Sequence, residues 1–216
     1  LAAESSAFAI RTAVAELGAE AFKYRKNELE LLSSRFYKQA RSNPFRFCMA
    51  DSSGQRLNYS KALIGSAALS RSIARICPDD EMIGVILPNS VPAALVNVAI
   101  TILGRIPVNL NFTASSEALD RAVKKCEIRH IFTSRQFIEK AGLEARSEMI
   151  FMEDFACTVS TGDKIFAALG FWCLPHGILR WLFRRRHARR INNPATVIFS
   201  SGSTGDPKGV LLSHAN

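Results

Sequence analysis

The residues best suited to chemistry in this 216-residue sequence lie near its end, where small hydroxyl residues and glycines surround a lysine. The apolar run 195–199 directly before them predicts a buried strand. Glycine reaches positive φ without steric cost, so a glycine-rich loop can turn its backbone N–H groups toward an anion. Hydroxyl groups add donors and an ammonium adds charge. The pattern predicts a polyphosphate-binding loop formed by Ser200, Ser201, Gly202, Ser203, Thr204, Gly205, Lys208 and Gly209.

The spacing within this loop separates it from a Walker A loop, in which Gly-Lys-Ser/Thr follows four free positions. Here proline precedes Lys208 and glycine follows it. The alternative to a phosphate-binding loop is an ordinary flexible Gly/Ser-rich loop after a strand. The run Ser200–Lys208, with Val210 and the sequel Ser213–Asn216, instead resembles the signature loop of the adenylate-forming superfamily. That superfamily includes acyl-CoA synthetases, luciferases and nonribosomal adenylation domains.

Two earlier segments extend the resemblance. Residues 57–59 and 104–111 are similar to two early elements of the superfamily, although Phe112 departs from the commoner proline-containing sequel. The region 84–142 looks closest to the synthetase half of the bacterial bifunctional acyl-ACP synthetase/2-acylglycerophosphoethanolamine acyltransferase family, with residues 108–114 and 133–135 carrying the match. This resemblance implies two parts. Residues 1–42 would be the helical tail of an upstream acyltransferase domain or a linker. Residues 43–216 would be the N-terminal part of the AMP-binding synthetase domain, truncated after the phosphate loop.

The resemblance also implies a reaction. ATP, with Mg²⁺, would activate a fatty acid as an acyl-adenylate, and the acyl group would pass to the thiol of acyl carrier protein for reacylation of a lysophospholipid. CoA is the alternative acceptor, because no residue in this sequence distinguishes the thiol of acyl carrier protein from that of CoA. The loop hydroxyls and glycines would wrap the phosphates, and Lys208 would orient them as the catalytic candidate. The other catalytic elements would lie beyond Asn216, so we expect the chain alone to be inactive.

A basic apolar segment spans residues 165–190. Its apolar and aromatic residues lead into an arginine cluster, a composition that suits contact with anionic phospholipid headgroups. The expected contact residues are Trp181, Arg184, Arg185, Arg186, Arg189 and Arg190. The alternative for this segment is that it packs on the domain and that its arginines are merely solvated. For the chain as a whole, the alternative from another functional class is a non-catalytic membrane-binding module whose glycine-rich loop no longer works. Pro175 and the glycines nearby argue against a spanning helix.

The positive charge of the chain is concentrated near its end. The net charge is +9, and residues 156–216 hold eight basic but only two acidic side chains, so the excess is local. No nucleic-acid fold signature accompanies the arginines, and we expect no nucleic-acid partner.

The five cysteines lack metal-ligand spacing, which predicts buried, reduced thiols and no metal site. We expect a protein at the cytoplasmic side of the bacterial inner membrane, or otherwise in the cytoplasm.

Apolar patterning predicts an α/β fold with a parallel sheet preceded by a helical segment. A helix should cover residues 5–41 with an interruption at Gly18, and a hairpin should follow at 45–50 and 56–59. Ser60 is the expected cap of the next helix. Strands are predicted at 83–87, 106–110, 128–133 and 149–152, separated by helices at 91–103, from Ser115 or Ser116 to 126, and at 134–141. His214 is expected to be a packing or helix-start residue at least as readily as a catalytic one.

Overall fold

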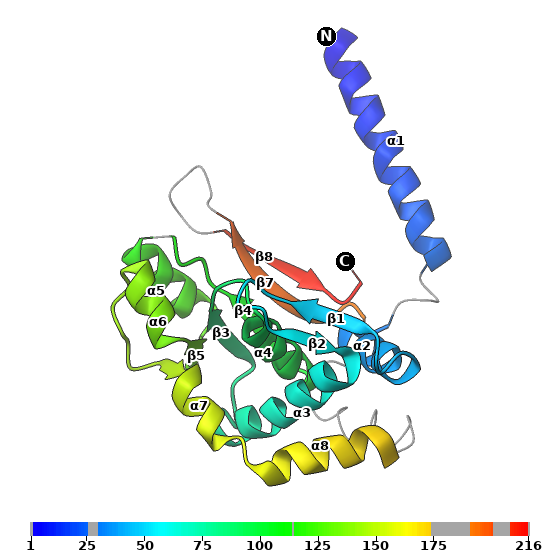
Figure 1. Ribbon diagram of the computed structural model, residues 1–216. Helices are drawn as coiled ribbons and strands as arrows, with labels where there is room; N and C mark the ends of the chain where they lie inside the picture. Colours follow the sequence, from blue (N-terminus) through cyan, green and yellow to red (C-terminus); the bar gives the residue numbers. More distant parts are fainter. Residues whose placement is uncertain (1, 26–29, 114, 174–190, 201–207, 216) are drawn as a thin grey trace. The chain divides into compact units, whose positions relative to one another are not determined.

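The computed structural model describes residues 2–25, 30–113, 115–173, 191–200 and 208–215. The chain divides into two compact units, Leu1–Glu30 and Leu31–Asn216. In the first unit, helix α1 covers Ala2–Arg25 (Figure 1). The predicted interruption at Gly18 is wrong, because the helix runs through that glycine and nothing lies within 4 Å of the position of a Cβ there. One glycine costs about 1 kcal/mol relative to alanine, which lowers helix stability without ending the helix.

The second unit is built on a six-stranded sheet with the order β6-β5-β3-β4-β7-β8 (Figure 1). Five of these strands are parallel, and only β8 runs antiparallel, against β7. Their bounds are Met82–Ile86 for β3, Ile106–Asn109 for β4, Ile131–Thr133 for β5, Met149–Phe151 for β6, Pro194–Ser200 for β7 and Lys208–Ser213 for β8. The predicted α/β class and its parallel sheet are confirmed, whereas β8 had no sequence prediction.

Helices cover both faces of the sheet. Side chains alternate along β3, so that Ile83 and Val85 enter one apolar cluster while Ile86 enters the other. The first cluster lies under α3 (Tyr59–Ile76), α4 (Val91–Ile102) and α7 (Met152–Thr158), and the second lies under α5 (Ser116–Lys125) and α6 (Arg135–Ala141). A Cβ at Gly84 would lie 2.9 Å from Ile131 Cγ1, so the second cluster packs too closely there for any side chain.

A two-stranded hairpin precedes the sheet, as predicted. Strands β1 (Phe47–Ala50) and β2 (Arg56–Asn58) pair antiparallel, and Gly54 takes φ of 83° in the turn. The predicted cap of α3 is corrected by two residues, from Ser60 to Asn58. Asn58 Oδ1 accepts the backbone N–H of Lys61 at 2.9 Å, and the hydroxyl of Ser60 donates to that same oxygen at 3.1 Å. Asparagine takes the cap because the helix begins at Tyr59, two residues earlier than a cap at Ser60 would require.

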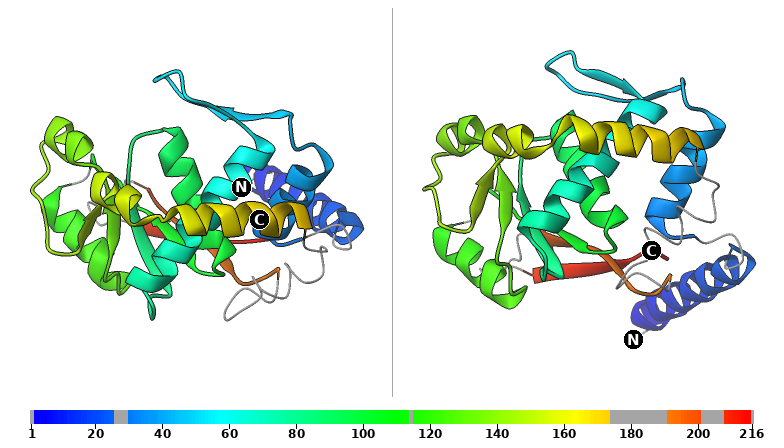
Figure 2. Two further views of the ribbon diagram at one scale, coloured as in Figure 1. Left: turned by 60° about the horizontal axis from the view of Figure 1, so that its bottom comes forward. Right: turned by 90° about the horizontal axis from the view of Figure 1, so that it is seen from below.

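Helices α2 (Leu32–Ser42) and α8 (Thr161–Cys173) complete the unit, and α8, yellow in Figure 2, lies along α3. The buried carboxylate of Asp163 on α8 binds Arg71 at 2.8 Å and Arg75 at 2.7 Å. Four apolar residues of α8 are partly exposed, namely Ile165, Phe166, Leu169 and Trp172, and the guanidinium of Arg71 on α3 lies over the ring of Phe166. Among the described residues, no helix is both long and apolar enough to cross a bilayer.

Candidate functional site

The strand order places a crevice at one edge of the sheet. From β3 the chain crosses to β4 on one side, and it then returns to β5 on the other side of β3. Successive crossovers that diverge in this way leave an opening outside the carboxyl ends of the two central strands, where α/β proteins bind their ligands. The carboxyl ends of β3, β4 and β7 therefore define the edge at which a site is expected.

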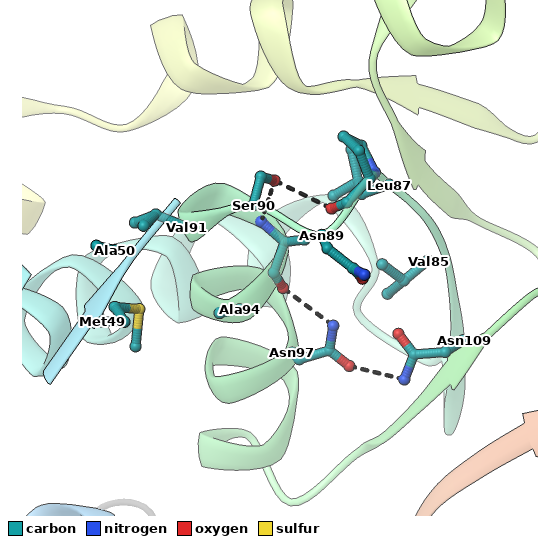
Figure 3. Close-up of a pocket in the computed structure, with 12 residues that line it drawn as sticks. Met49, Ala50, Val85, Leu87, Asn89, Ser90, Val91, Ala94, Asn97 and Asn109 are labelled. Carbon is teal, nitrogen blue, oxygen red and sulfur yellow. Dashed lines mark hydrogen bonds between the residues drawn. The ribbon is translucent and has the colours of Figure 1, made fainter. Parts of the chain in front are cut away.

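A cavity of about 450 Å³ occupies this position (Figure 3). It lies between the β1 strand of the hairpin, the turn after β3, the first turns of α4 and the end of β4. The lining residues are Met49, Ala50, Val85, Leu87, Pro88, Asn89, Ser90, Val91, Ala93, Ala94, Asn97 and Asn109. None of these residues is ionisable, so the cavity offers amides and apolar surface to a neutral group.

Two asparagine amides form the polar side of the cavity. Asn109 donates from Nδ2 to Asn97 Oδ1 at 3.0 Å, and Asn97 donates from Nδ2 to the carbonyl of Ala93 at 3.0 Å (Figure 3). Asn109 Nδ2 also lies 3.5 Å from the Thr196 hydroxyl, which donates to the carbonyl of Pro107 at 2.8 Å. The row of hydrogen bonds fixes the amide orientations and connects the cavity with β7. The polar residue at the end of the apolar run 106–109 was the sequence signal that could have identified Asn109.

The N-terminus of α4 borders the cavity and is already capped. Ser90 Oγ accepts the N–H of Ala93 at 3.4 Å, and Asp51 Oδ2 accepts the N–H of Val91 at 2.9 Å. Hydrogen bonds from Ser53, then from Val91, hold the pKa of Asp51 below its usual value. The carboxylate thus occupies the positive end of the helix and joins the hairpin turn to α4. Phosphate groups are consequently expected at the neighbouring loop rather than at this helix.

That neighbouring loop begins at the same edge of the sheet. Ile198 of β7 pairs with Asn109 of β4, and two residues later Ser200 pairs with Lys208 across the β7–β8 ladder. Lys208 is exposed at the start of β8. The predicted loop residues Ser201, Gly202, Ser203, Thr204 and Gly205 lie outside the described residues. The described strands therefore place both ends of the loop beside the carboxyl edge of β4.

Gly209 has a packing environment in the sheet. It pairs with Phe199, and a Cβ at Gly209 would lie 3.1 Å from Phe199 Cε1. Such a contact is tighter than the core normally accepts, so the ring covers the backbone of the glycine. A role for Gly209 in phosphate binding, predicted from composition, would act through its backbone alone.

His214 lies in the interior, 7% exposed, beyond β8. Its backbone N–H donates to the carbonyl of Asn193 at 3.2 Å. Its Nδ1 accepts the N–H of Leu32, the first residue of α2, at 3.3 Å. Burial lowers the pKa of the imidazole, which favours the neutral form that can accept this bond. These contacts favour the packing reading of His214, because no helix begins at this residue and its imidazole lies against the start of α2.

The thiols depart in part from the sequence prediction. All five cysteines are free, but Cys157 and Cys173 are exposed, and only Cys77 is fully buried. Burial, then the nearby charge of Asp80, raises the pKa of the Cys77 thiol to about 12. A thiol that is buried and protonated is no nucleophile. The apolar contexts of Cys157 and Cys173 misled the prediction because they belong to the outward sides of α7 and α8.

The predicted membrane-contact residues all follow α8. Trp181, Arg184, Arg185, Arg186, Arg189 and Arg190 lie outside the described residues. Of the segment 165–190, the structure describes the part that ends at Cys173.

The family model of AMP-binding enzymes matches residues 36–216, and the chain belongs to this family. A 4-chlorobenzoate–CoA ligase from Arthrobacter sp is 28% identical over 75% of this chain and 29% of its own length. Long-chain-fatty-acid–CoA ligase 1 from Cavia porcellus is 24% identical over 71% of this chain and 23% of its own length. The chain thus spans less than a third of these relatives.

A solved structure supports the same assignment at the level of the fold. The N-terminal subdomain of Klebsiella oxytoca NpsA superposes with a TM-score of 0.63 at 14% identity, covering 86% of this chain and 42% of that one.

Proposed function

We propose that this chain supplies the N-terminal part of an AMP-forming acid–thiol ligase. One observation carries the proposal. The β7–β8 hairpin sets the ends of a Ser/Thr/Gly-rich loop, Ser200 and Lys208, at the carboxyl edge of β4, beside the cavity that contains Asn109. Membership of the AMP-binding enzyme family and the ligase relatives support this assignment.

The proposed reaction has two steps. A carboxylate oxygen attacks the α-phosphorus of ATP and pyrophosphate leaves, which gives an acyl-adenylate. A thiol sulfur then attacks the acyl carbon, loses its proton, and AMP leaves. Residues 200–209 would bind the β- and γ-phosphates, and the ammonium of Lys208 would offset the charge that develops on pyrophosphate. A loop that ends in Lys208, next to a cavity without ionisable residues, would separate the polyphosphate from the neutral parts of the ligands.

The residues described around the cavity show whether this part of the chain could ligate Mg²⁺. No carboxylate lines the cavity, and the Asp51 carboxylate nearby accepts hydrogen bonds from Ser53 and Val91. These residues therefore do not fit a Mg²⁺ ion, which prefers several oxygen ligands in octahedral geometry. In the proposed enzyme the ion would arrive with the phosphates of ATP, and no step depends on residues of this cavity holding it.

The acid and the acceptor form the finer part of the proposal. We infer a fatty acid as the substrate and acyl carrier protein as the acceptor, with transfer to a lysophospholipid by an acyltransferase domain that residues 1–42 would follow. The resemblance of residues 108–114 and 133–135 to that bifunctional family supports this reading. CoA as the acceptor is the alternative that the ligase relatives favour.

The test uses the full-length gene product. It is incubated with labelled palmitate, Mg²⁺ and ATP, with holo-acyl carrier protein and CoA offered in parallel, and the thioester is identified. Acyl carrier protein thioester would support the finer proposal, and acyl-CoA alone would replace it with a general fatty-acid ligase. Lys208→Ala should abolish most acyl-adenylate formation, whereas Lys164→Ala on α8 should not. No adenylate from a folded enzyme with any of a panel of carboxylic acids would overturn the proposal.

Membrane contact is a second proposal, favoured by the exposed side chains of α8. Leu169 and Trp172 are 56% and 54% exposed, and the arginine cluster 184–190 follows in sequence. We infer peripheral binding to anionic lipid at the cytoplasmic side of the bacterial inner membrane. The chain should bind phosphatidylglycerol vesicles, and replacing Arg184, Arg185 and Arg186 with Gln should abolish this binding. Unchanged binding after that substitution would refute the proposal, and Lys208→Ala serves as the control.

A further inference from the structure

Three donor side chains gather at the amino edge of the sheet, opposite the cavity. Cys77 ends α3, Asp80 precedes β3, and His130 precedes β5. One donor atom from each lies within 4.8 Å of the other two. Asp80 Oδ2 is 2.6 Å from His130 Nδ1. Because Cys77 and His130 are far apart in sequence, their spacing gave no metal signal, and the prediction of no metal site did not consider this cluster.

The burial of the three residues is graded. The Cys77 side chain is fully buried, the Asp80 side chain is 3% exposed, and the His130 side chain is 32% exposed. Two anionic or potentially anionic donors thus lie in the interior, while the imidazole is partly accessible to solvent. A cation could enter past His130 and reach donors that solvent no longer screens.

Backbone hydrogen bonds fix the segments that carry these donors. The N–H of Cys77 donates to Ile73 at 2.8 Å, and Arg105 donates to the carbonyls of Cys77 and Pro78. The carbonyl of His130 accepts the N–H of Gly84 in β3 at 2.9 Å. Fixed backbones leave only side-chain rotations for adjustment, which is the condition for a preorganised metal site.

We propose that Cys77, Asp80 and His130 bind a transition-metal dication, for which Zn²⁺ is the probe. Thiolate, carboxylate and imidazole form the mixed ligand set that suits Zn²⁺. At Zn–ligand bonds of about 2.0–2.3 Å, tetrahedral ligands lie about 3.3–3.7 Å apart. Asp80 Oδ2 and His130 Nδ1, now 2.6 Å apart, would therefore move apart to admit the ion between them, which side-chain rotation allows. Water would supply the fourth ligand.

The charges at the site balance on binding. The Cys77 Sγ–H bond breaks, the proton passes to water, and the Sγ–metal bond forms. The thiolate and the Asp80 carboxylate then offset the dication, while the Arg105 guanidinium remains on the carbonyls of Cys77 and Pro78. The ion would tie the end of α3 to the start of β5, and this role is independent of the proposed ligase reaction.

The ordinary alternative is an Asp80–His130 ion pair packed beside a thiol. The two readings differ in metal binding, which can be measured directly on the 216-residue chain. After treatment with chelator, the protein is titrated with ZnCl₂ by calorimetry and with CoCl₂ by absorption spectroscopy. We expect one equivalent of Zn²⁺, an intense visible spectrum of four-coordinate Co²⁺, a thiolate-to-cobalt charge-transfer band, and a melting temperature that rises with zinc concentration.

Matched variants decide between the readings. His130→Gln should weaken Zn²⁺ binding at least about 100-fold, the upper end of the loss from an outer-shell partner. Cys77→Ser should remove the charge-transfer band, while Cys157→Ser, which removes an exposed thiol, should change neither. His130→Gln decides by itself if Cys77→Ser does not fold. Absence of stoichiometric binding to the parent protein, or Zn²⁺ binding that survives His130→Gln, would overturn the proposal.

Discussion

The Nδ1 atom of His214 accepts the backbone N–H of Leu32 at 3.3 Å across 182 positions of sequence. Leu32 opens α2, and Leu31, the residue at its N-cap, makes no side-chain cap hydrogen bond. The first N–H groups of a helix lack partners within it. The imidazole therefore performs a capping role that is normally played by a neighbouring Ser, Thr, Asp or Asn, and it fastens the end of β8 to α2.

Removal of this acceptor should destabilise the unit Leu31–Asn216. We expect His214→Ala to lower the free energy of unfolding by about 1–2 kcal/mol, because a cap is lost and a buried side chain is truncated. His214→Asn keeps an acceptor near the position of Nδ1 and should lose less. Urea unfolding followed by circular dichroism measures both. Equal losses in the two variants would mean that packing, and not the hydrogen bond, is what His214 contributes.

Stability should also depend on pH through His214. Its pKa is lowered by burial, so the unfolded chain takes up a proton at a higher pH than the folded chain. The contribution is complete above the unfolded pKa of about 6.5 and is lost as the pH falls through the lower folded value. His214→Asn should flatten the fall of the stability profile below about pH 6.5. A profile in the variant that falls as steeply as that of the parent would assign the pH dependence to another group.

The parts of this fold that could be predicted from sequence are those with local signals. The β3–α4–β4 unit showed an apolar strand, a mainly apolar helix and a second apolar strand, and all appear close to their predicted bounds. Strand β8 was missed because Val210 and Leu211, on opposite faces of the strand, are both apolar and exposed, so the strand lacks a clear polar alternation. The amide pair Asn97–Asn109 could not be predicted, because it depends on how α4 lies against β4.

The Asp163 carboxylate should be the main attachment of α8 to α3. It is 4% exposed and accepts hydrogen bonds from Arg75 and Arg71, which hold its pKa well below the usual range. We expect Asp163→Asn to cost about 2 kcal/mol, as for hydrogen bonds to a charged group. The unfolded carboxyl binds a proton first as the pH falls, so this contribution is present above about pH 4 and lost in more acidic solution.

Asp154→Asn is the matched control for that experiment. Asp154 pairs with Arg135 at 2.5 Å, but both side chains are more than half exposed, and water screens such a pair. Urea midpoints at pH 7 should move for Asp163→Asn and stay in place for Asp154→Asn. If both variants kept the parental midpoint, the Asp163 contacts would carry no net stability.

Gly209 should act through Phe199. We expect Gly209→Ala to lower stability by about 1 kcal/mol, because the new methyl would press on the ring 3.1 Å away. In a Phe199→Leu background the same substitution should cost little, which would give a coupling free energy in a double-mutant cycle of urea unfolding. Additive effects would remove the packing argument. A loss of acyl-adenylate formation at unchanged stability would instead return Gly209 to the phosphate site.

Asn109 should report whether the uncharged cavity faces the nucleotide. Asn109→Ala removes the donor to Asn97, whereas Asn109→Asp keeps the shape and adds a negative charge two residues below the level of the loop. In the full-length ligase we expect Asn109→Asp to raise the KM for ATP at least about 10-fold above that of Asn109→Ala, since repulsion of about 1.4 kcal/mol suffices for that factor. Asn111→Asp lies outside the cavity lining and should have a smaller effect. Equal KM values in the two Asn109 variants would place ATP away from this amide pair and leave the cavity to the acid or the thiol.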